Sequence, residues 1–302
     1  MILDFDDFVI WMYVTVDDCW QVIAPLYQRP GPPPTTCSDS ELITIALVSE
    51  LCGWDRETHW DTHWKPYRYL FPRLPERSRL NRRRRNLWLA VNHIRQVVLT
   101  MMDIAFDGQG VVDSLPLPVL TFHLAPQRTR AWDAHGATFG YCASKQQYYF
   151  GFRLHLVVTL GGLIVDFVLT SADTDERPVA EQMLRDRGGG TYFGDKGYVD
   201  DPLAERLRTE VGVALIALRR TNQRRQLDPE LRRQINRVRQ IIETVNSQLV
   251  EQLHIQRNHA HTFWGFCTRL YTKLAAHTLS IAINRWLGNP DWLQIAQLIH
   301  PS

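Results

Sequence analysis

The order of helical and strand-like segments after residue 110 most constrains what this chain can fold into. A short apolar run, 110–115, comes first, and two longer apolar runs, 148–160 and 163–170, are joined by Gly161 and Gly162. A two-residue glycine turn between apolar runs predicts a β-hairpin, because glycine accepts the positive φ angles of such turns. We therefore expect a mixed sheet that begins with one strand and continues with a hairpin.

The segments that follow alternate between the two periodicities. We predict helices over 175–187 and 201–211, strands over 191–195 and 213–218, and a last long helix over 229–253. Three glycines follow the first of these helices, and Pro202 lies in the first turn of the second. This order predicts an α/β fold, a mixed sheet flanked by helices.

The first hundred residues are expected to be helical. Ser38 and Glu41 form a capping-box pattern in front of the apolar run 42–51, and 86–106 has the spacing of an amphipathic helix. The segment 29–34, RPGPPP, cannot hold a helix and predicts a linker. We expect three parts, an all-helical N-terminal region (1–107), a sheet domain (108–285) and a C-terminal tail (286–302).

The composition is that of an ordinary globular protein, with 45% hydrophobic and 22% charged residues, and it excludes a disordered chain. The five cysteines are scattered without a Cys-x-x-Cys pair, which favours reduced thiols and a cytoplasmic protein. No apolar run reaches the roughly 18 residues that a membrane span requires. Acidic residues near the start are unlike a secretory signal. We expect no membrane partner.

Basic residues are concentrated in two arginine clusters although the net charge is only +2. The segment 73–85 holds seven arginines and one acid, and 219–239 holds eight arginines and two acids, so each carries +6 (7 − 1 and 8 − 2). Guanidinium groups form forked hydrogen bonds to phosphate oxygens. Two such clusters favour a polyanion, above all DNA, as the partner. The alternative is a solvated helical face with internal ion pairs.

Three acids stand where a sheet fold places its chemistry, at strand ends and on the helix against the sheet. Asp113 and Asp195 end predicted strands, and Glu243 borders the apolar stripe of the last helix. If they converge, each pair at about 4 Å repels by roughly 4 kcal/mol at an effective dielectric near 20. A divalent cation relieves that repulsion, and an all-oxygen ligand set favours Mg²⁺ or Mn²⁺. Two such ions are suited to phosphodiester chemistry.

Each of the three acids also has an ordinary structural interpretation. A single Asp at a strand end commonly forms a turn or caps a helix, and Glu243 stands four residues after Arg239, the spacing of a surface ion pair. Three other acids, Asp166, Asp173 and Asp175, are set aside, because they belong to the hairpin or to the loop that caps the next helix.

Four strings of the sequence carry a family resemblance: GVVDSLPLPV, YYFGFRLHLV, YFGDKGYVD and RVRQIIETVNSQL. With SDSELITIAL and FPRLPERSRLNRRRR upstream, they resemble the DDE transposases of bacterial insertion sequences over about residues 35 to 280. The resemblance implies a ribonuclease H-like catalytic domain. It also implies that Asp113, Asp195 and Glu243 are the catalytic residues and hold two Mg²⁺ or Mn²⁺ ions. Arg239 matches a basic position before the Glu, whereas Val250 stands where relatives carry a base after it.

Several residues near these acids are candidates for binding DNA. Arg153 and His155 alternate on one face of a predicted strand, and Lys196 follows Asp195. A half-buried structural role is the alternative for His155, and solvation for Lys196. Trp132 and Trp264 are candidates for base stacking or for the core. The DNA-binding set that we predict is Arg82, Arg83, Arg84, Arg85, Arg153, His155, Lys196, Arg219, Arg220 and Arg239.

Two histidine pairs are candidates for a zinc site. His59 and His63 are four apart and His259 and His261 two apart, but no cysteine or His-Glu-x-x-His pattern accompanies them, so zinc is not expected. The helices before residue 100 are expected either to read the DNA ends as a helix-turn-helix-like module or to pack as a bundle.

The expected function is a transposase that cuts DNA at the ends of an insertion sequence and joins the 3′-hydroxyl ends to target DNA. Paired ends favour a homodimer on double-stranded DNA, in the bacterial nucleoid. The alternatives are a nuclease of the same fold without strand transfer and a DNA-binding protein that has lost catalysis.

Overall fold

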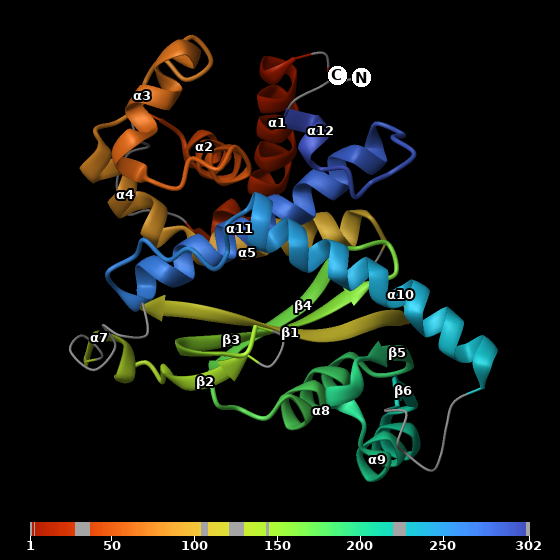
Figure 1. Cartoon of the computed structure of the whole chain (residues 1–302). Helices are drawn as coiled ribbons and strands as arrows, with labels where there is room; N and C mark the ends of the chain where they lie inside the picture. The colour runs from red at the N-terminus through yellow and green to blue at the C-terminus, as the bar shows by residue number, and fades with distance from the viewer. Residues whose placement is uncertain are drawn as a thin grey trace. The chain divides into compact units, whose positions relative to one another are not determined.

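A computed structural model of the chain divides into a helical unit and a unit built on one sheet (Figure 1). The structure describes residues 2, 4–27, 37–103, 108–120, 130–142, 145–219 and 228–299. The helical unit comprises 1–102, 248–255 and 259–302, and the sheet unit comprises 103–247 and 256–258. The predicted linker 29–34 and Arg220 lie outside the described residues.

The helical unit is assembled from both ends of the chain. Its elements are α1 (Phe5–Ile23), η1 (Ala24–Tyr27), α2 (Asp39–Leu51), η2 (Glu57–His59), α3 (Trp60–Trp64), η3 (Lys65–Tyr67), α4 (Arg77–Asn86), α5 (Trp88–Met101), the π-helical turn η6 (Gln248–Gln252), α11 (Phe263–Trp286) and α12 (Ala296–Ile299). The predicted capping box is confirmed, since Ser38 and Glu41 bond each other's backbone N–H groups. α2 and α11 are buried on nearly all sides, and α11 packs against α1, α2 and α5.

The sheet unit carries the expected order of elements. They are β1 (Gln109–Leu120), α7 (Arg130–Asp133), β2 (Thr138–Cys142), β3 (Gln147–Thr159), β4 (Ile164–Ser171), α8 (Glu176–Arg187), β5 (Gly190–Gly194), η5 (Lys196–Tyr198), α9 (Asp201–Val211), β6 (Val213–Ala217) and α10 (Pro229–Ser247). The predicted hairpin is β3–β4, and Gly162 has the positive φ of +84° that its turn requires.

The sheet places its first strand in the middle. β1 pairs antiparallel with β3 on one side and parallel with β5 on the other, and β6 continues parallel to β5. β4 and β2 pair antiparallel with successive stretches of β3. A central first strand, an antiparallel hairpin and two parallel strands are the arrangement of the ribonuclease H-like fold, which the structure therefore confirms. The short strand β2 was not predicted, because five residues that include a glycine show little periodicity.

The two faces of the sheet are covered by different helices (Figure 1). Tyr192 and Val112 pack with Leu184 of α8 and Leu207 of α9. The neighbouring residue Phe193 points the other way and packs with Ile235 of α10. This alternation, with a period of two, assigns every residue of β1 and β5 to either the α8–α9 face or the α10 face.

The elements at the C-terminal end differ from the predictions. The helix expected over 229–253 is α10 to Ser247 followed by η6, and α11 was not foreseen inside the domain drawn to residue 285. α11 lies in the helical unit, because its apolar surface is covered by α1, α2 and α5. The functional domain limits at 107/108 and 285/286 stay a prediction.

Helices of the described part of the chain fall short of what a bilayer crossing demands in length and apolar character.

Candidate active site

Asp113 and Asp195 lie next to each other at the end of two parallel strands. Val112 of β1 pairs with Gly194 of β5, which is the last pair of that ladder. Each aspartate is therefore one residue beyond the same pair, although 82 residues separate them in the sequence (195 − 113). β1 continues past this point while β5 ends, so the two carboxylates stand where the sheet opens.

Asp113 projects toward α10. Val112 packs on the α8–α9 face, so the next residue points to the opposite face. There Asn246 Nδ2 donates to Asp113 Oδ2 at 2.8 Å, and the Ser114 N–H donates to Oδ1 at 2.8 Å. Asp195 caps η5, where its Oδ1 accepts from the Gly197 N–H at 2.7 Å. Both carboxylates are half-buried.

The surroundings of Asp113 oppose its ionisation. Burial raises the pKa of Asp113 to about 7, and repulsion by Asp195 and Glu176 acts in the same direction. The hydrogen bonds from Ser114 and Asn246 favour the charged form and limit the rise of the pKa. A carboxyl group whose pKa is raised by burial and by two acidic neighbours is typical of a functional site.

Glu176 is a member of this acidic group that the sequence analysis missed. It is the first residue of α8, beside the N-cap Asp175. Ser114 Oγ donates to Glu176 Oε1 at 2.7 Å, and Arg153 is ion-paired with the same oxygen. A Cβ added at Gly197 would lie 3.0 Å from Asp195 Oδ1 and 3.2 Å from Glu176 Oε2, so both acids flank this glycine. Its position in the first turn of the helix after the hairpin was the available signal.

Glu243 lies on the turn of α10 before the one that touches Asp113. Asn246 is three residues further along the same helix face. The Glu243 carboxylate is 63% exposed and accepts from Arg239 Nη2 at 3.3 Å. This is the i,i+4 ion pair that the spacing in the sequence indicates. The structure thus brings Asp113, Asp195 and Glu176 together, and it holds Glu243 about one helical turn from Asn246 in an ion pair with Arg239.

The chemistry of these donors fits a hard divalent cation, because they are carboxylate oxygens and one buried member resists ionisation without a counter-charge. Within the described ranges, no group of three or more His, Cys, Asp or Glu residues is gathered closely enough to hold a metal ion. A complete ligand set therefore requires that at least one further carboxylate lies closer to Asp113 and Asp195.

Arg153 and His155 share a face of β3, but it is the α8–α9 face. They pair with Pro116 and Ser114, which point away from Asp113. His155 is buried, and its Nε2 is 2.9 Å from Thr170 Oγ1; burial first, and then Arg153, lowers the pKa of His155 to about 4. We therefore leave His155 out of the proposed DNA-binding set, because a buried neutral imidazole offers DNA no contact.

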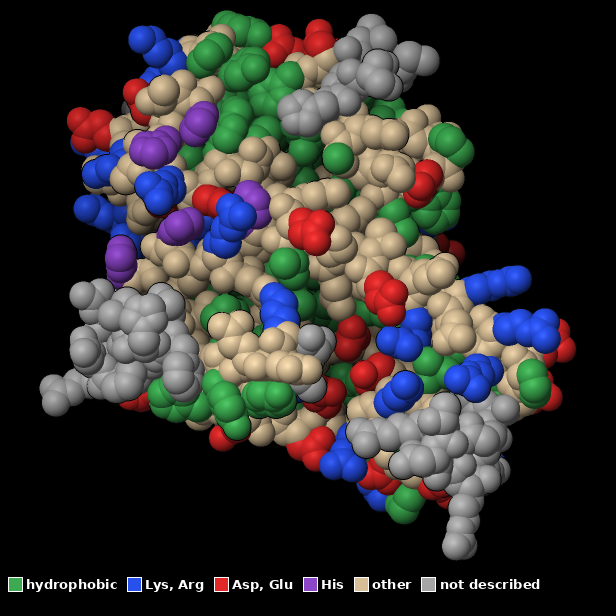
Figure 2. All heavy atoms as spheres, in the orientation of Figure 1, with side chains coloured by type: hydrophobic (Ala, Val, Ile, Leu, Met, Phe, Trp, Pro, Cys, Tyr) green, Lys and Arg blue, Asp and Glu red, His purple; other side chains and the backbone are tan. Residues whose placement is uncertain are grey.

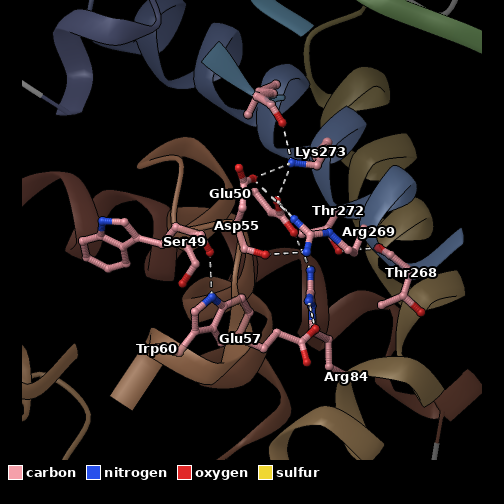
Figure 3. A network of polar contacts seen from close by, with 12 residues as sticks. Ser49, Glu50, Asp55, Glu57, Trp60, Arg84, Thr268, Arg269, Thr272 and Lys273 are labelled. Carbon is pink, nitrogen blue, oxygen red and sulfur yellow. Dashed lines mark hydrogen bonds and ion pairs between the residues drawn. The ribbon is translucent and has the colours of Figure 1, made fainter. Parts of the chain in front are cut away.

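The arginine cluster 73–85 divides into buried and exposed members. Arg84 is only 2% exposed and pairs with Glu50 at 2.7 Å and with Glu57 (Figure 3). Arg83 pairs with Asp39. Arg82 and Arg85 are exposed. The prediction that all four bind DNA is corrected for Arg84, since its charge serves an internal network.

The second cluster lies mainly along α10. Arg232, Arg233 and Arg237 are exposed, and Figure 2 shows basic side chains along the position of this helix. Arg219, by contrast, is ion-paired with Asp201 and mostly buried. Lys196 is exposed beside the two aspartates. This region therefore offers cations to a polyanion mainly from α10 and η5.

The two tryptophans differ in the same way. Trp132 is 3% exposed and belongs to the core, whereas Trp264 is 53% exposed at the start of α11. His63 stacks on Trp54 with ring centroids 4.7 Å apart.

The known proteins to which this chain is similar are transposases. The model of a family described as "Transposase DDE domain" matches residues 106–262, which are 157 of the 302 residues and include Asp113, Asp195 and Glu243. Among solved structures, the chain is similar to piggyBac transposase in a synaptic complex with hairpin DNA, with 9% identity, a TM-score of 0.44 and coverage of 96% of this chain and 76% of that one. The search of curated proteins gave no match. With more than half of its length matched, the chain belongs to the transposase DDE domain family.

Proposed function

We propose that this chain cuts DNA at the ends of an insertion sequence and joins the freed 3′-hydroxyl ends to target DNA. The observation that carries the proposal is the meeting of Asp113 and Asp195 at the open end of β1 and β5, with Asn246 of α10 bonded to Asp113. Acids from strands far apart in sequence meet beside a helix that carries a further carboxylate, Glu243.

Two Mg²⁺ or Mn²⁺ ions would supply Lewis-acid stabilisation of the phosphodiester and a more acidic attacking hydroxyl. The residues that would hold them are Asp113, Asp195 and Glu243. Asn246 and the Ser114 N–H fix the two oxygens of Asp113, so that its carboxylate is oriented before DNA binds. Asp195 is oriented in turn by the Gly197 N–H.

The third carboxylate has two candidates. Glu243 is favoured by the family resemblance and by its freedom, because an exposed i,i+4 pair with Arg239 is weak and can open. Glu176 is nearer to Asp113 and Asp195 but is held by Arg153 and Ser114. We assign Glu243 as the ligand. Glu176 and Arg153 then form a neutral pair that positions the sheet end.

DNA is proposed to lie over the exposed cations. Lys196 follows Asp195, Arg239 and the exposed arginines lie on the helix that carries Glu243 and Asn246, and Arg82 and Arg85 are exposed in the helical unit. Two protomers are expected to act on paired element ends as a homodimer, in the bacterial nucleoid.

Cleavage of DNA by single-site variants tests the proposal. The substrate is a plasmid that carries the coding sequence with its genomic flanks, incubated with Mg²⁺ or Mn²⁺. We expect Asp113→Asn, Asp195→Asn and Glu243→Gln each to lower cleavage at least 10³-fold, on the order expected when a metal ligand is lost. Asp186→Asn, an exposed aspartate of α8, is the matched control and is expected to cleave normally.

Two results would contradict the assignment. Unchanged cleavage by Asp195→Asn would exclude it from the reaction, and normal activity of Glu243→Gln with an inactive Glu176→Gln would make Glu176 the third ligand. A strand-transfer assay with a pre-cut end separates the nuclease alternative, which gives shortened DNA without joined product.

A further inference from the structure

A cavity of about 430 Å³ lies within the helical unit, apart from the three acids. It is bordered by the segment before η2, by α4 and by the start of α11. Its walls include five basic or imidazole side chains, from Arg56, Arg85, His259, His261 and Arg269. Figure 2 shows histidine and basic side chains gathered on the side of the view where α3 and α4 lie. Cavities of this size take ligands as large as a nucleotide.

The acids around this cavity are already ion-paired with buried cations of the helical unit. Glu50, Asp55 and Glu57 face Arg84, Arg269 and Lys273, so three negative charges meet three positive ones (Figure 3). Asp55 also lies 2.8 Å from His254 Nδ1. The internal network is therefore balanced, and it leaves the remaining cations of the wall to a ligand.

Those remaining cations are Arg56 and Arg85. Both are exposed, and within the part of the chain that the structure describes neither has an ion-pair partner. Behind them Arg269 is 8% exposed, and its Nε has no hydrogen-bond acceptor among the described residues. A buried donor without an acceptor costs free energy unless a ligand or water satisfies it. The wall therefore presents two exposed guanidinium groups, and the guanidinium of Arg269 is buried behind them.

The start of α11 adds to the positive potential. This helix has 24 residues, and its N-cap Thr262 accepts from the Gly265 N–H at 3.2 Å. The dipole of a long helix favours negative charge near its N-terminal end. Burial lowers the pKa of His259, and repulsion by Arg269, Arg56 and Lys273 lowers it further against attraction by Asp55. At His259 the neighbouring cations therefore outweigh Asp55.

We propose that this cavity binds a phosphate group of the DNA backbone, held by Arg56 and Arg85 beside the start of α11. The proposal rests on the proposed function only in taking DNA as the substrate. The volume exceeds that of a phosphate ion, which favours a phosphate that is part of a nucleotide over a free anion. Arg269 lies behind these two arginines, and its ion pairs with Glu50 and Asp55 keep it in place.

The test compares the binding of a fluorescein-labelled 20-base-pair duplex, followed by anisotropy at several salt concentrations. The pocket variants are Arg56→Gln/Arg85→Gln and His261→Ala, all at exposed positions. The control is Lys65→Gln, which removes an exposed cation of η3 outside the cavity. For the double variant we expect about tenfold weaker binding and a slope of log affinity against log salt that falls by about one per lost phosphate contact. Lys65→Gln is expected to bind within about twofold of the parent.

Equal affinity and equal slope for the double variant and Lys65→Gln would overturn the proposal. A thermal shift assay with inorganic phosphate tests for a free anion, the other source of the same chemistry. If phosphate stabilises the parent but not the double variant, and DNA binding is unchanged, the cavity is a small-anion site and the proposal is overturned. A melting curve of each variant shows whether the double variant is destabilised. If it is, His261→Ala tests the cavity in its place.

The binding comparison is repeated in an Asp195→Asn background. Equal loss of affinity in that background supports the cavity independently of cleavage. If Asp195→Asn leaves cleavage unchanged, the proposed function fails while the outcome for the cavity still stands.

Discussion

At the residue scale, the behaviour of the site depends on how Asp113 is held. Its two oxygens accept from Asn246 and from the Ser114 N–H, while Asp195 and Glu176 repel it. Donors of this kind orient a carboxylate ligand and lower the cost of its charge. Asn246 is therefore as much a part of the candidate active site as the acids, although it binds no metal in our proposal.

Replacing Asn246 tests this orienting role. Asn246→Ala removes a donor from Asp113, and we expect 10- to 100-fold slower cleavage, the usual cost of an outer-shell partner. Asn236→Ala, at an exposed position of the same helix, is the control. Equal rates for Asn246→Ala and Asn236→Ala would show that the contact has no role.

His277 provides a stability prediction away from the site. It is fully buried in α11, its Nε2 is 2.9 Å from Gln248 Oε1, and burial lowers its pKa from 6.5 to about 4. Between these values the unfolded chain binds a proton that the folded chain does not, so stability falls as pH falls, by about 1.4 kcal/mol per pH unit. Urea unfolding of His277→Gln at pH 7, 5.5 and 4.5 is expected to show a shallower dependence than the parent. Parallel curves would contradict this.

At the element scale, α4, α2 and α11 are joined by a buried ionic network. Glu50 of α2 is 1% exposed and contacts Arg84 of α4 and Arg269 and Lys273 of α11 (Figure 3). Burial opposes its charge, but the attraction of Lys273, Arg269 and Arg84 prevails and lowers the pKa of Glu50 to about 2. Ion pairs with this one carboxylate thus connect three helices from distant parts of the sequence.

Removing that carboxylate leaves the three cations Arg84, Arg269 and Lys273 with only two acids, Asp55 and Glu57. We expect Glu50→Gln to lower the free energy of unfolding by about 3–5 kcal/mol, as for other broken buried pairs. Glu210→Gln breaks the exposed pair with Arg185 and is expected to cost less than about 1 kcal/mol. Chemical denaturation measures both, and similar losses for the two variants would show that the network is not cooperative.

At the scale of the whole molecule, the distribution of charge matters more than its sum. The net charge is +2, but ion pairs take up many of the arginines and leave a smaller exposed set for DNA. Non-specific binding to DNA depends on how many phosphates such cations neutralise. An arginine's contribution is therefore decided by its exposure, even among neighbours such as Arg82 and Arg84.

These two neighbours give opposite predictions. Arg82→Gln is expected to reduce the slope of log affinity against log salt by about one without loss of stability, since the side chain is exposed. Arg84→Gln is expected to lower stability and leave that slope unchanged, since the side chain is 2% exposed and paired with Glu50. Anisotropy at several salt concentrations and thermal melting check both. A reduced slope for Arg84→Gln would contradict the buried assignment.

The sequence by itself determined the local elements and their order. The capping box at Ser38, the glycine turn of β3–β4, the strand that contains Asp113 and the strand that Asp195 follows are set by spacing, capping and turn chemistry, which act between residues a few positions apart. The prediction that a strand ends at Asp113 is wrong, since β1 continues to Leu120. Strand order and the alternation along each strand then place those two aspartates together. The fold class and both aspartates were therefore predictable.

The tertiary structure alone decided the partners of the charged side chains. Asn246 meets Asp113 across 133 residues, Glu50 meets Lys273 across 223, and Glu176 joins the acids although its local sequence indicates a helix start. It also buried Arg84 and His155 and brought α11 to α2 and α5. A local pattern specifies which backbone forms and which face is apolar. Which distant charge compensates a buried charge depends on packing, because burial sets the cost of leaving that charge unpaired.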